Sequence, residues 1–372
     1  MNPETLAVRS GRRIDNAIGA VSPPIHLSST FEKSNDGDLF YSRIANPNRT
    51  SLEECLCSLE DGAEAIAFGS GMAAISSVFQ SLSTGDHVII ADDVFCGVND
   101  LLEQLLGRWG LTHTIVDLTN LQKVKEALRS TTKLIWAETP SNPLLKVTDI
   151  QALSTVAKES EILLGVDSTW GTPLLQQPIL LGADIVVHST TKYLGGHSDL
   201  TGGIVVCKDN FPLTERIRKI QELMGGIPSP FDCFLLMRGI STLAVRMAAH
   251  CSSAQAISER LNEHPEVHNV NYPGLAQHRQ HETARRQMRS FGGMLSFQVK
   301  GGPERAARVC RSVRLFTNAT SLGSVDSLIE HRAPVEGPNT KTPRDLIRVS
   351  VGLEHPDDLM SDLDMALHLS AI

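Results

Sequence analysis

The fold of this chain is decided by residues 185–197, whose sequence is IVVHSTTKYLGGH. The run from Ile185 to Val187 is apolar and β-branched, which predicts a buried strand. Small hydroxylated residues, a lysine and a Gly-Gly pair follow it, and they predict a loop that ends in a turn. Because ligands of α/β folds bind at the carboxyl ends of strands, this loop is the expected position of the functional site.

Lys192 stands in this loop, close to the hydroxyl groups of Ser189 and Thr191. A lysine amine can form a Schiff base with an aldehyde, while hydroxyl groups can hold a phosphate. Pyridoxal 5'-phosphate (PLP) is the cofactor that needs both, and it also needs an acidic partner for its ring nitrogen. A second apolar run, residues 162–166, ends at Asp167, which is therefore a candidate for that partner.

Composition limits the class of protein. The chain has 372 residues, enough for two or three packed subregions, and its 41% hydrophobic and 20% charged residues are ordinary for a soluble globular protein. The net charge is −8 and no basic stripe is present, so a nucleic acid is not an expected partner. No apolar run approaches the ~20 residues of a membrane span, and the N-terminus lacks a signal-peptide core, so the expected location is cytoplasmic.

The seven cysteines fit no metal site or disulfide framework, because their number is odd and their spacing matches no known pattern. Most are expected to be small buried hydrophobic residues, and no metal ligand is predicted. Cys96 is the exception, because it lies in a loop that is expected to border the functional site.

Residues 181–199, LGADIVVHSTTKYLGGHSD, resemble the lysine signature of the Cys/Met-metabolism family of PLP enzymes, which includes cystathionine γ-synthase, cystathionine γ-lyase and methionine γ-lyase. Further motifs of this family follow in the same order over essentially the whole chain. The resemblance implies an α/β fold, the PLP-dependent transferase fold type I (aspartate aminotransferase-like). Its large sheet has seven strands that are mostly parallel, and a smaller α+β domain forms the C-terminal part.

The resemblance also implies three parts: an N-terminal arm over residues 1–50, a PLP-binding domain over 51–245 and a C-terminal domain over 246–372. Prolines in the arm predict an extended chain, and residues 51–66 are expected to form a helix. In this family the arm contacts a neighbouring subunit. The implied assembly is a homo-oligomer with shared active sites, at least a dimer and by expectation a tetramer.

Matching the family residue by residue implies the PLP site. Lys192 carries the cofactor, Asp167 pairs with the ring nitrogen, and Asn142 binds the ring hydroxyl oxygen. The other implied cofactor contacts are Tyr41 and Arg43 from the neighbouring arm, the amides of Gly71 and Met72, the ring-stacking position Phe95, and Thr169, Ser189 and Thr191.

Phe95 is a departure from the family, which has a tyrosine at this position that stacks on the ring and moves protons. Phenylalanine keeps the stacking face but cannot serve as an acid or base. Cys96 replaces a glycine and Val98 replaces a threonine of the same motif. Cys96 is an alternative proton carrier, although its side chain, one residue along, can point elsewhere.

Arg348 matches the family's substrate arginine, and a guanidinium is the expected clamp for an α-carboxylate. Glu138, Thr320 and Ser321 match positions near the substrate. Residues 331–341, HRAPVEGPNTK, replace the His-Pro-Ala…Thr-His pattern of better-known members, which leaves the second substrate open.

The implied activity is PLP-dependent elimination or replacement at Cγ of a sulfur-containing or activated homoserine-type amino acid, as in cystathionine γ-lyase or γ-synthase. The first alternative is β-elimination from cystathionine or cysteine by a carbon–sulfur lyase. Because the tyrosine is missing, an atypical substrate of secondary metabolism is another alternative. The alternative of a different class is a weakly catalytic, regulatory PLP-binding paralogue.

Overall fold

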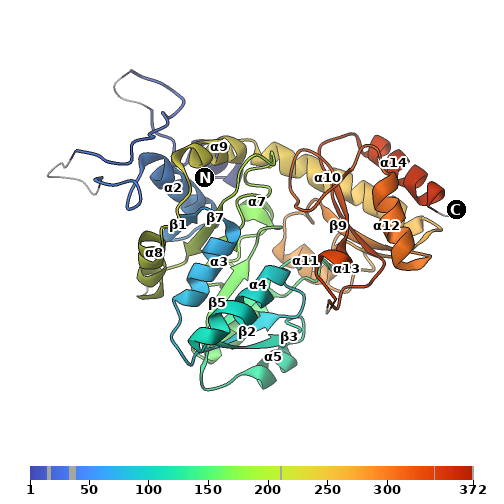
Figure 1. Cartoon of the computed structure of the whole chain (residues 1–372), viewed down its shortest axis with the longest axis horizontal. Helices are drawn as coiled ribbons and strands as arrows, with labels where there is room; N and C mark the ends of the chain where they lie inside the picture. The colour runs from blue at the N-terminus through green and yellow to red at the C-terminus, as the bar shows by residue number, and fades with distance from the viewer. Residues whose placement is uncertain (15–17, 33–38, 210–211, 339, 371–372) are drawn as a thin grey trace.

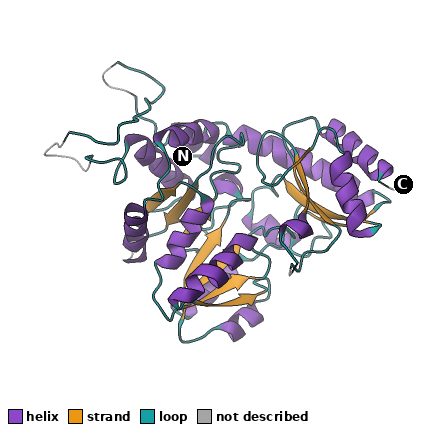
Figure 2. Cartoon of the chain, viewed as in Figure 1, coloured by secondary structure: helices purple, strands orange, loops and turns teal. Residues whose placement is uncertain are grey.

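A computed structural model describes residues 1–14, 18–32, 39–209, 212–338 and 340–370 of the chain. Figures 1 and 2 show two sheets in separate parts of the molecule, each flanked by helices. The long helix α10 (Leu243–Glu263) runs toward the C-terminal part, where it packs against β8, β9 and α14. The predicted boundary after residue 245 falls in the first turn of this helix, and the division into domains remains a prediction.

The large sheet has seven strands in the order β1-β7-β6-β5-β4-β2-β3. All neighbours from β6 to β3 are parallel, whereas β7 is antiparallel to both β1 and β6. The predicted seven-stranded, mostly parallel sheet is therefore confirmed. The strands are β1 (Glu64–Phe68), β2 (His87–Ala91), β3 (Thr112–Val116), β4 (Thr132–Glu138), β5 (Leu163–Asp167), β6 (Ile185–His188) and β7 (Gly203–Cys207).

The smaller C-terminal sheet has the order β10-β11-β12-β9-β8. It is antiparallel except for the short β10–β11 pair. Together with its helices it forms the smaller α+β part that the resemblance implies. Its strands are β8 (Val267–Asn271), β9 (Met294–Val299), β10 (Thr317–Asn318), β11 (Leu328–His331) and β12 (Leu346–Ser350).

The helices connect the strands and cover the sheets (Figure 2). Among the described residues, none of them combines the length and the apolar character that a bilayer span requires. Besides α10 they are α1 (Pro3–Arg9), α2 (Pro47–Glu60), α3 (Gly71–Gln80), α4 (Cys96–Asp100), α5 (Leu121–Ala127), α6 (Ile150–Glu159), α7 (Thr172–Leu175), α8 (Pro212–Met224), α9 (Pro230–Ile240), α11 (His281–Gln287), α12 (Gly302–Ser312), α13 (Arg332–Val335) and α14 (Pro356–Leu369), with a π-helical turn η1 (Leu101–Leu105) and a 3₁₀ turn η2 (Leu106–Trp109) after α4.

The core of the large sheet explains why its strands are almost continuously apolar. Parallel strands are covered on both faces, so both sets of alternating side chains are buried. Trp136 of β4 is fully buried and meets the ring of Phe79 from α3 edge-on, with 5.2 Å between ring centroids. Gly165 of β5 must be small, because a Cβ there would lie 2.8 Å from the Trp136 ring.

Two expectations for the N-terminal region were wrong. The arm is not extended throughout, since residues 3–9 form α1, which has a proline in its first turn and buries Ala7. The predicted helix over 51–66 ends earlier, because Asp61 adopts a left-handed conformation with φ of 59° and closes α2. The chain then enters β1, which pairs with β7 and is buried from residue 65 to residue 68.

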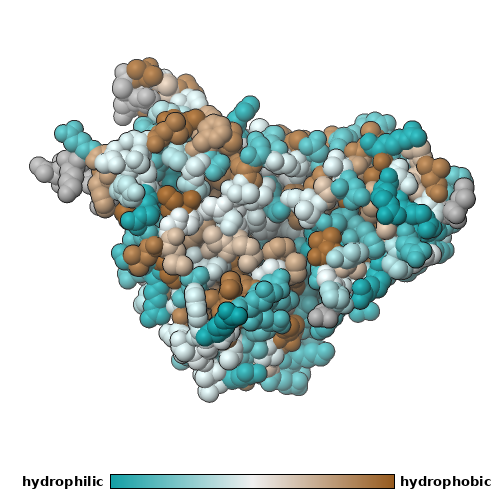
Figure 3. Space-filling view, viewed as in Figure 1, coloured by the Kyte–Doolittle hydropathy of each residue, from teal (hydrophilic) through white to brown (hydrophobic). Residues whose placement is uncertain are grey.

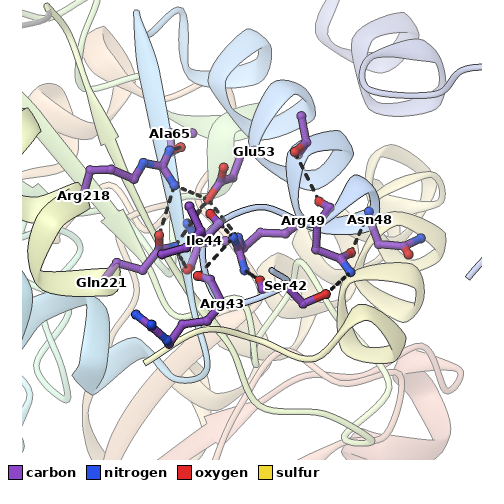
Figure 4. Close-up of polar contacts among 12 residues, drawn as sticks. Ser42, Arg43, Ile44, Asn48, Arg49, Glu53, Ala65, Arg218 and Gln221 are labelled. Carbon is purple, nitrogen blue, oxygen red and sulfur yellow. Dashed lines mark hydrogen bonds and ion pairs between the residues drawn. The ribbon is translucent and has the colours of Figure 1, made fainter. Parts of the chain in front are cut away.

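The arm is fastened to the body through Arg49 (Figure 4). This buried guanidinium donates to the backbone oxygens of Ser42, at 2.8 Å, and Ile44, at 2.5 Å. Glu53, one turn further along α2, accepts from Arg218 Nη1 of α8 at 2.9 Å. The backbone on either side of residue 43 is thereby held against α2, which fixes where the arm leaves the body.

Candidate active site

A cavity of about 240 Å³ lies where the carboxyl ends of β4, β5 and β6 meet the start of α3 and strand β12. The sequence predicted a functional site at these strand ends. The predicted site residues that lie outside the N-terminal arm all line this cavity. The predicted residues that line it are Gly71, Met72, Phe95, Glu138, Asn142, Asp167, Thr169, Ser189, Thr191, Lys192, Thr320, Ser321 and Arg348.

Two buried carboxyl groups form one side of the cavity. Glu138 and Asp167 are the last residues of β4 and β5, and the parallel register pairs them directly. Burial raises the pKa of both groups, and the charge of Asp167 raises the pKa of Glu138 further, well above its ordinary value. Since two adjacent carboxylates cannot both ionise without cost, we assign the charge to Asp167 and treat Glu138 as neutral.

Asp167 keeps its charge through its neighbours. Its Oδ1 accepts a hydrogen bond from the amide of Thr169 at 2.9 Å, and this contact and the charge of His188 lower a pKa that burial raises. His188 pairs with the buried Glu60 at 2.6 Å. The Thr169 hydroxyl in turn accepts from the amide of Ser189 at 2.9 Å, which ties the end of β5 to the lysine loop.

Lys192 extends from this loop into the cavity. Its Nζ donates to the hydroxyl of Ser321 at 2.7 Å. Burial lowers the pKa of the Lys192 amine to about 8, and the positive charges of Arg348 and Arg332 lower it in the same direction. A substantial share of the amine is therefore neutral near physiological pH and available as a nucleophile or base.

The first turn of α3 offers backbone N–H groups to the cavity. Ser70 caps the helix by accepting from the amide of Ala73 at 3.1 Å, while the amides of Gly71 and Met72 have no acceptor within the helix. A Cβ on Gly71 would lie 2.8 Å from Ser189 Cβ, so only glycine allows this close approach to the lysine loop. The turn provides the geometry of an anion site.

Arg348 enters the cavity from β12. Its Nη2 lies 2.9 Å from Glu330 Oε2 and 3.2 Å from the backbone oxygen of Ser321, and its Nη1 donates to Asn142 Oδ1 at 3.1 Å. Burial lowers the pKa of this guanidinium to about 10, which still leaves it charged at neutral pH. The contacts fix a cation opposite the strand ends.

These groups fit PLP in their chemistry. Helix amides and hydroxyl groups suit its phosphate, the charged Asp167 suits a protonated ring nitrogen, and the Lys192 amine suits its aldehyde. The close approach at Gly71 supports this fit, because it brings the helix amides next to the hydroxyl groups of the lysine loop. Bound there, PLP would supply an electron sink for the substrate's Cα, while Arg348 remains for a carboxylate.

Phe95 and Cys96 are separated by the structure. Phe95 lines the cavity, and its amide donates to Glu138 Oε2 at 2.7 Å. Cys96 lines a neighbouring cavity instead, together with Asn142 and Glu336, and burial raises the pKa of its thiol. The geometry therefore does not support Cys96 as the replacement for the missing tyrosine hydroxyl.

Tyr41 and Arg43 lie outside the cavity's lining in their own chain. The Arg43 guanidinium lies over the Tyr41 ring, 5.5 Å from its centroid, and donates to the backbone oxygen of Glu222 in α8. Their predicted role in a neighbouring subunit's site remains a prediction.

Six lining residues were not among the individually predicted site residues, although Leu322 lies in a loop that was expected to line the substrate pocket. They are Ser70, Ile75, Trp170, Thr201, Leu322 and Arg332. Most are neighbours of predicted residues in the chain, so their position follows once the loops are placed. Arg332 is different, because it belongs to the stretch that departs from the family pattern. The difference between this stretch and the family pattern was the sequence feature that could have indicated Arg332.

Comparisons with known proteins agree with a PLP site in this chain. Residues 4–368 match the family model described as Cys/Met metabolism PLP-dependent enzyme. The chain is 45% identical to cystathionine gamma-synthase of Mycobacterium tuberculosis (strain ATCC 25618 / H37Rv), covering 98% of this chain and 96% of that protein. It is 43% identical to cystathionine beta-lyase of Coxiella burnetii, over 98% and 97%. The crystal structure of metB from Corynebacterium glutamicum superposes with a TM-score of 0.96 at 41% identity, over 99% and 98%.

The lowered pKa of Lys192 predicts how the apoprotein captures PLP. Since only the neutral amine attacks an aldehyde, the second-order rate of capture should rise about tenfold per pH unit below pH 8 and level off above it. The rate is measured by the absorbance change on mixing. A parallel series with Nα-acetyl-lysine in place of the protein corrects for pH-dependent ionisation of PLP itself. A rate that keeps rising to about pH 10, as for an ordinary lysine, would contradict the assignment.

Proposed function

The chain belongs to the family of Cys/Met metabolism PLP-dependent enzymes, and we propose that it catalyses elimination or replacement at Cγ of a sulfur-containing or activated homoserine-type amino acid. The observation that carries this proposal is one cavity that holds the Lys192 amine, the buried Asp167 and the fixed cation Arg348. Relatives named cystathionine gamma-synthase and cystathionine gamma-lyase support chemistry at Cγ, whereas a relative named cystathionine beta-lyase supports the alternative of β-elimination.

The side chains that line the cavity have different roles in the proposed reaction. We infer that Arg348 binds the substrate α-carboxylate, because its contacts with Glu330 and Asn142 fix the direction of its guanidinium. The Lys192 amine is the base for the Cα proton and then for a Cβ proton, since departure of a γ-substituent requires the loss of both, and it returns a proton at a later step. The hydrogen bond to Ser321 orients this amine between transfers. Asp167 would hold its negative charge against the ring nitrogen of PLP, and bound PLP would supply the electron sink for the substrate's Cα.

Phe95 limits proton transfer in this cavity. It retains an aromatic face but has no hydroxyl group, and Cys96 faces a different cavity. A leaving group that needs a proton is therefore poorly served at this position. This favours a substrate with an activated side chain, or an atypical substrate of secondary metabolism, over one that must expel a thiol. The alternative of β-elimination from cystathionine or cysteine also expels a thiol or sulfide, so Phe95 counts against it.

We also propose a homo-oligomer, at least a dimer and by expectation a tetramer, in which each arm completes a neighbouring site. Arg43 and Tyr41 lie outside their own chain's cavity, while their backbone is held firmly by Arg49. On the face in Figure 3, hydrophobic residues gather around the arm and the helices beside it. The exposed apolar residues of the arm, α8 and α9 include Leu27, Leu39, Phe40, Leu223, Met224 and Phe231. A cytoplasmic location belongs to the same proposal.

A substrate panel tests the function. The PLP-loaded protein is mixed with cystathionine, cysteine, methionine, homocysteine and O-acylated homoserines, with and without a thiol acceptor. We expect consumption of a γ-substituted substrate with release of 2-oxobutanoate when no acceptor is present. Lys192→Ala is the control and should release none. Pyruvate as the sole product would shift the assignment to β-elimination, and no consumption of any member would support the weakly catalytic reading.

Replacing Phe95 tests the missing proton carrier. Phe95→Tyr should raise turnover of substrates that expel a thiol by at least about 10-fold, since a positioned acid or base contributes ~10²–10⁴-fold. Turnover of O-acylated homoserines should change little, because a carboxylate leaves without a proton. The two rates are compared in one preparation, with Phe95→Leu as the control for the aromatic face. Equal changes for both substrate types would contradict this account.

Shared sites can be tested by mixing inactive variants. Lys192→Ala and Arg43→Ala should each have little activity alone, whereas dissociation and reassembly of an equal mixture should restore about a quarter of the wild-type activity in a dimer. Half of the dimers are then mixed, and one of their two sites has both residues intact. If each chain completes its own site, the mixture will be no more active than the mean of the two variants.

A further inference from the structure

A second arginine lies in the wall of the cavity beside Arg348. Arg332 begins α13, directly after β11, and only 2% of its surface is exposed. The family pattern has proline at this position. Binding of a substrate α-carboxylate by Arg348 therefore does not explain why an arginine stands at position 332. A buried guanidinium is costly unless its N–H groups are paired, so each of its contacts matters.

Two of its nitrogen atoms are paired. The Nε donates to Glu336 Oε1 at 2.8 Å, and the Nη1 donates to Glu330 Oε2 at 2.9 Å. Glu336 is itself held in place, because its other oxygen accepts from the hydroxyls of Thr340 and Thr342, each at 2.6 Å. The plane of the Arg332 guanidinium is therefore fixed from two sides.

The third nitrogen is not paired. Nη2 of Arg332 is buried and has no hydrogen-bond partner in the part of the chain that the structure describes. Arg332 nevertheless lines the cavity that holds Lys192 and Arg348. A preorganised guanidinium with one free edge in a substrate cavity is a binding group for a carboxylate or phosphate oxygen.

The surrounding charges favour an anion at this place. Glu330 Oε2 receives both Arg332 and Arg348, at 2.9 Å each, so one carboxylate is shared between two guanidinium groups. Glu336 is the other carboxyl partner of Arg332 on this wall. Glu138, the other carboxyl group that acts on Arg332, is treated as neutral because of its raised pKa. A substrate α-carboxylate on Arg348 leaves Arg332 for a second negative group.

The position of Arg332 suits the far end of a substrate side chain. Its partner Glu336 lines a second cavity of about 450 Å³, and Asn142, which binds Arg348, lines both cavities. Arg332 and Glu336 thus form part of the wall between the two spaces. Because Arg332 and Arg348 both contact Glu330 Oε2, a second anionic group on a substrate anchored at Arg348 can reach Arg332.

We propose that Arg332 is a specificity-determining residue that binds a second anionic group at the end of the substrate's side chain. The substrate class is an amino acid whose γ-substituent ends in a carboxylate or a phosphate. This inference rests on the proposed function for the identity of the reaction, whereas the binding of a second anion can be measured without turnover.

The kinetic test compares two γ-esters that differ in one charge. The wild-type enzyme should have a kcat/KM for O-succinyl-L-homoserine roughly 10- to 100-fold above that for O-acetyl-L-homoserine, the range expected of a charged hydrogen bond. Arg332→Gln should remove this preference by raising the KM of the succinyl ester far more than that of the acetyl ester. The readout is the ratio between the two esters, because loss of the Arg332 charge also acts on Lys192 and so affects both. Arg332→Lys should retain part of it. Arg344→Gln, an exposed arginine on the same segment, is the matched control. O-phospho-L-homoserine distinguishes a phosphate from a carboxylate.

A binding measurement separates this inference from the proposed function. Calorimetric titration of the PLP-loaded protein with glutarate and with butyrate compares two acids that differ in a second carboxylate. Glutarate should bind at least about 10-fold more tightly to the wild type, and Arg332→Gln should abolish the difference. This result without turnover of any ester would refute the proposed function and retain the second anion site. Turnover with no preference for either second charge, in the wild type itself, would overturn the role of Arg332 even if its variants fail to fold.

Discussion

The parallel register of β4, β5 and β6 is the constraint on which the site depends. It brings Glu138 next to Asp167 and places the lysine loop immediately after β6. Two carboxyl groups at one buried edge cannot both be charged without a large cost, so the surroundings must choose between them. The Thr169 amide and His188 stabilise the charge on Asp167, which leaves Glu138 neutral. A slip of one residue in any of these strands would turn these side chains to the other face of the sheet.

A second register completes the cavity from the C-terminal sheet. Glu330 of β11 and Arg348 of β12 are directly paired in their antiparallel ladder, so the ion pair between them follows from the strand alignment. Arg332 lies two residues beyond Glu330 and uses the same carboxylate oxygen. Two cations are thus fixed side by side, and their charges, added to burial, lower the pKa of Lys192. The small sheet therefore sets the protonation of a lysine carried by the large one.

Sequence alone predicted the parts of this site that are encoded locally. The apolar runs that become β5 and β6 end at Asp167 and at the lysine loop, and strand ends of a parallel sheet meet at one edge. Arg332 was missed because its role depends on contacts that no local pattern contains, above all a buried nitrogen without a partner. The strand β1 was missed for a similar reason, since its pairing with β7 joins segments far apart in the sequence. The cavity that Cys96 lines could be identified only from the structure, because it depends on the position of the first turn of α4.

Phe95 and Arg332 are two departures from the family pattern that point to one kind of leaving group. A thiol has a pKa of ~8.5 and leaves readily only when a group supplies a proton, whereas a carboxylic acid with a pKa of ~4 leaves as its anion. The phenyl ring of Phe95 cannot supply that proton, and Cys96 lies on the other side of the wall. An ester that expels a carboxylate needs no proton at this step. If the departing acid carries a second charge, the unpaired Nη2 of Arg332 binds that charge both before and after the bond breaks. The loss of the tyrosine hydroxyl at Phe95 and the presence of a guanidinium at Arg332 therefore suit the same substrate.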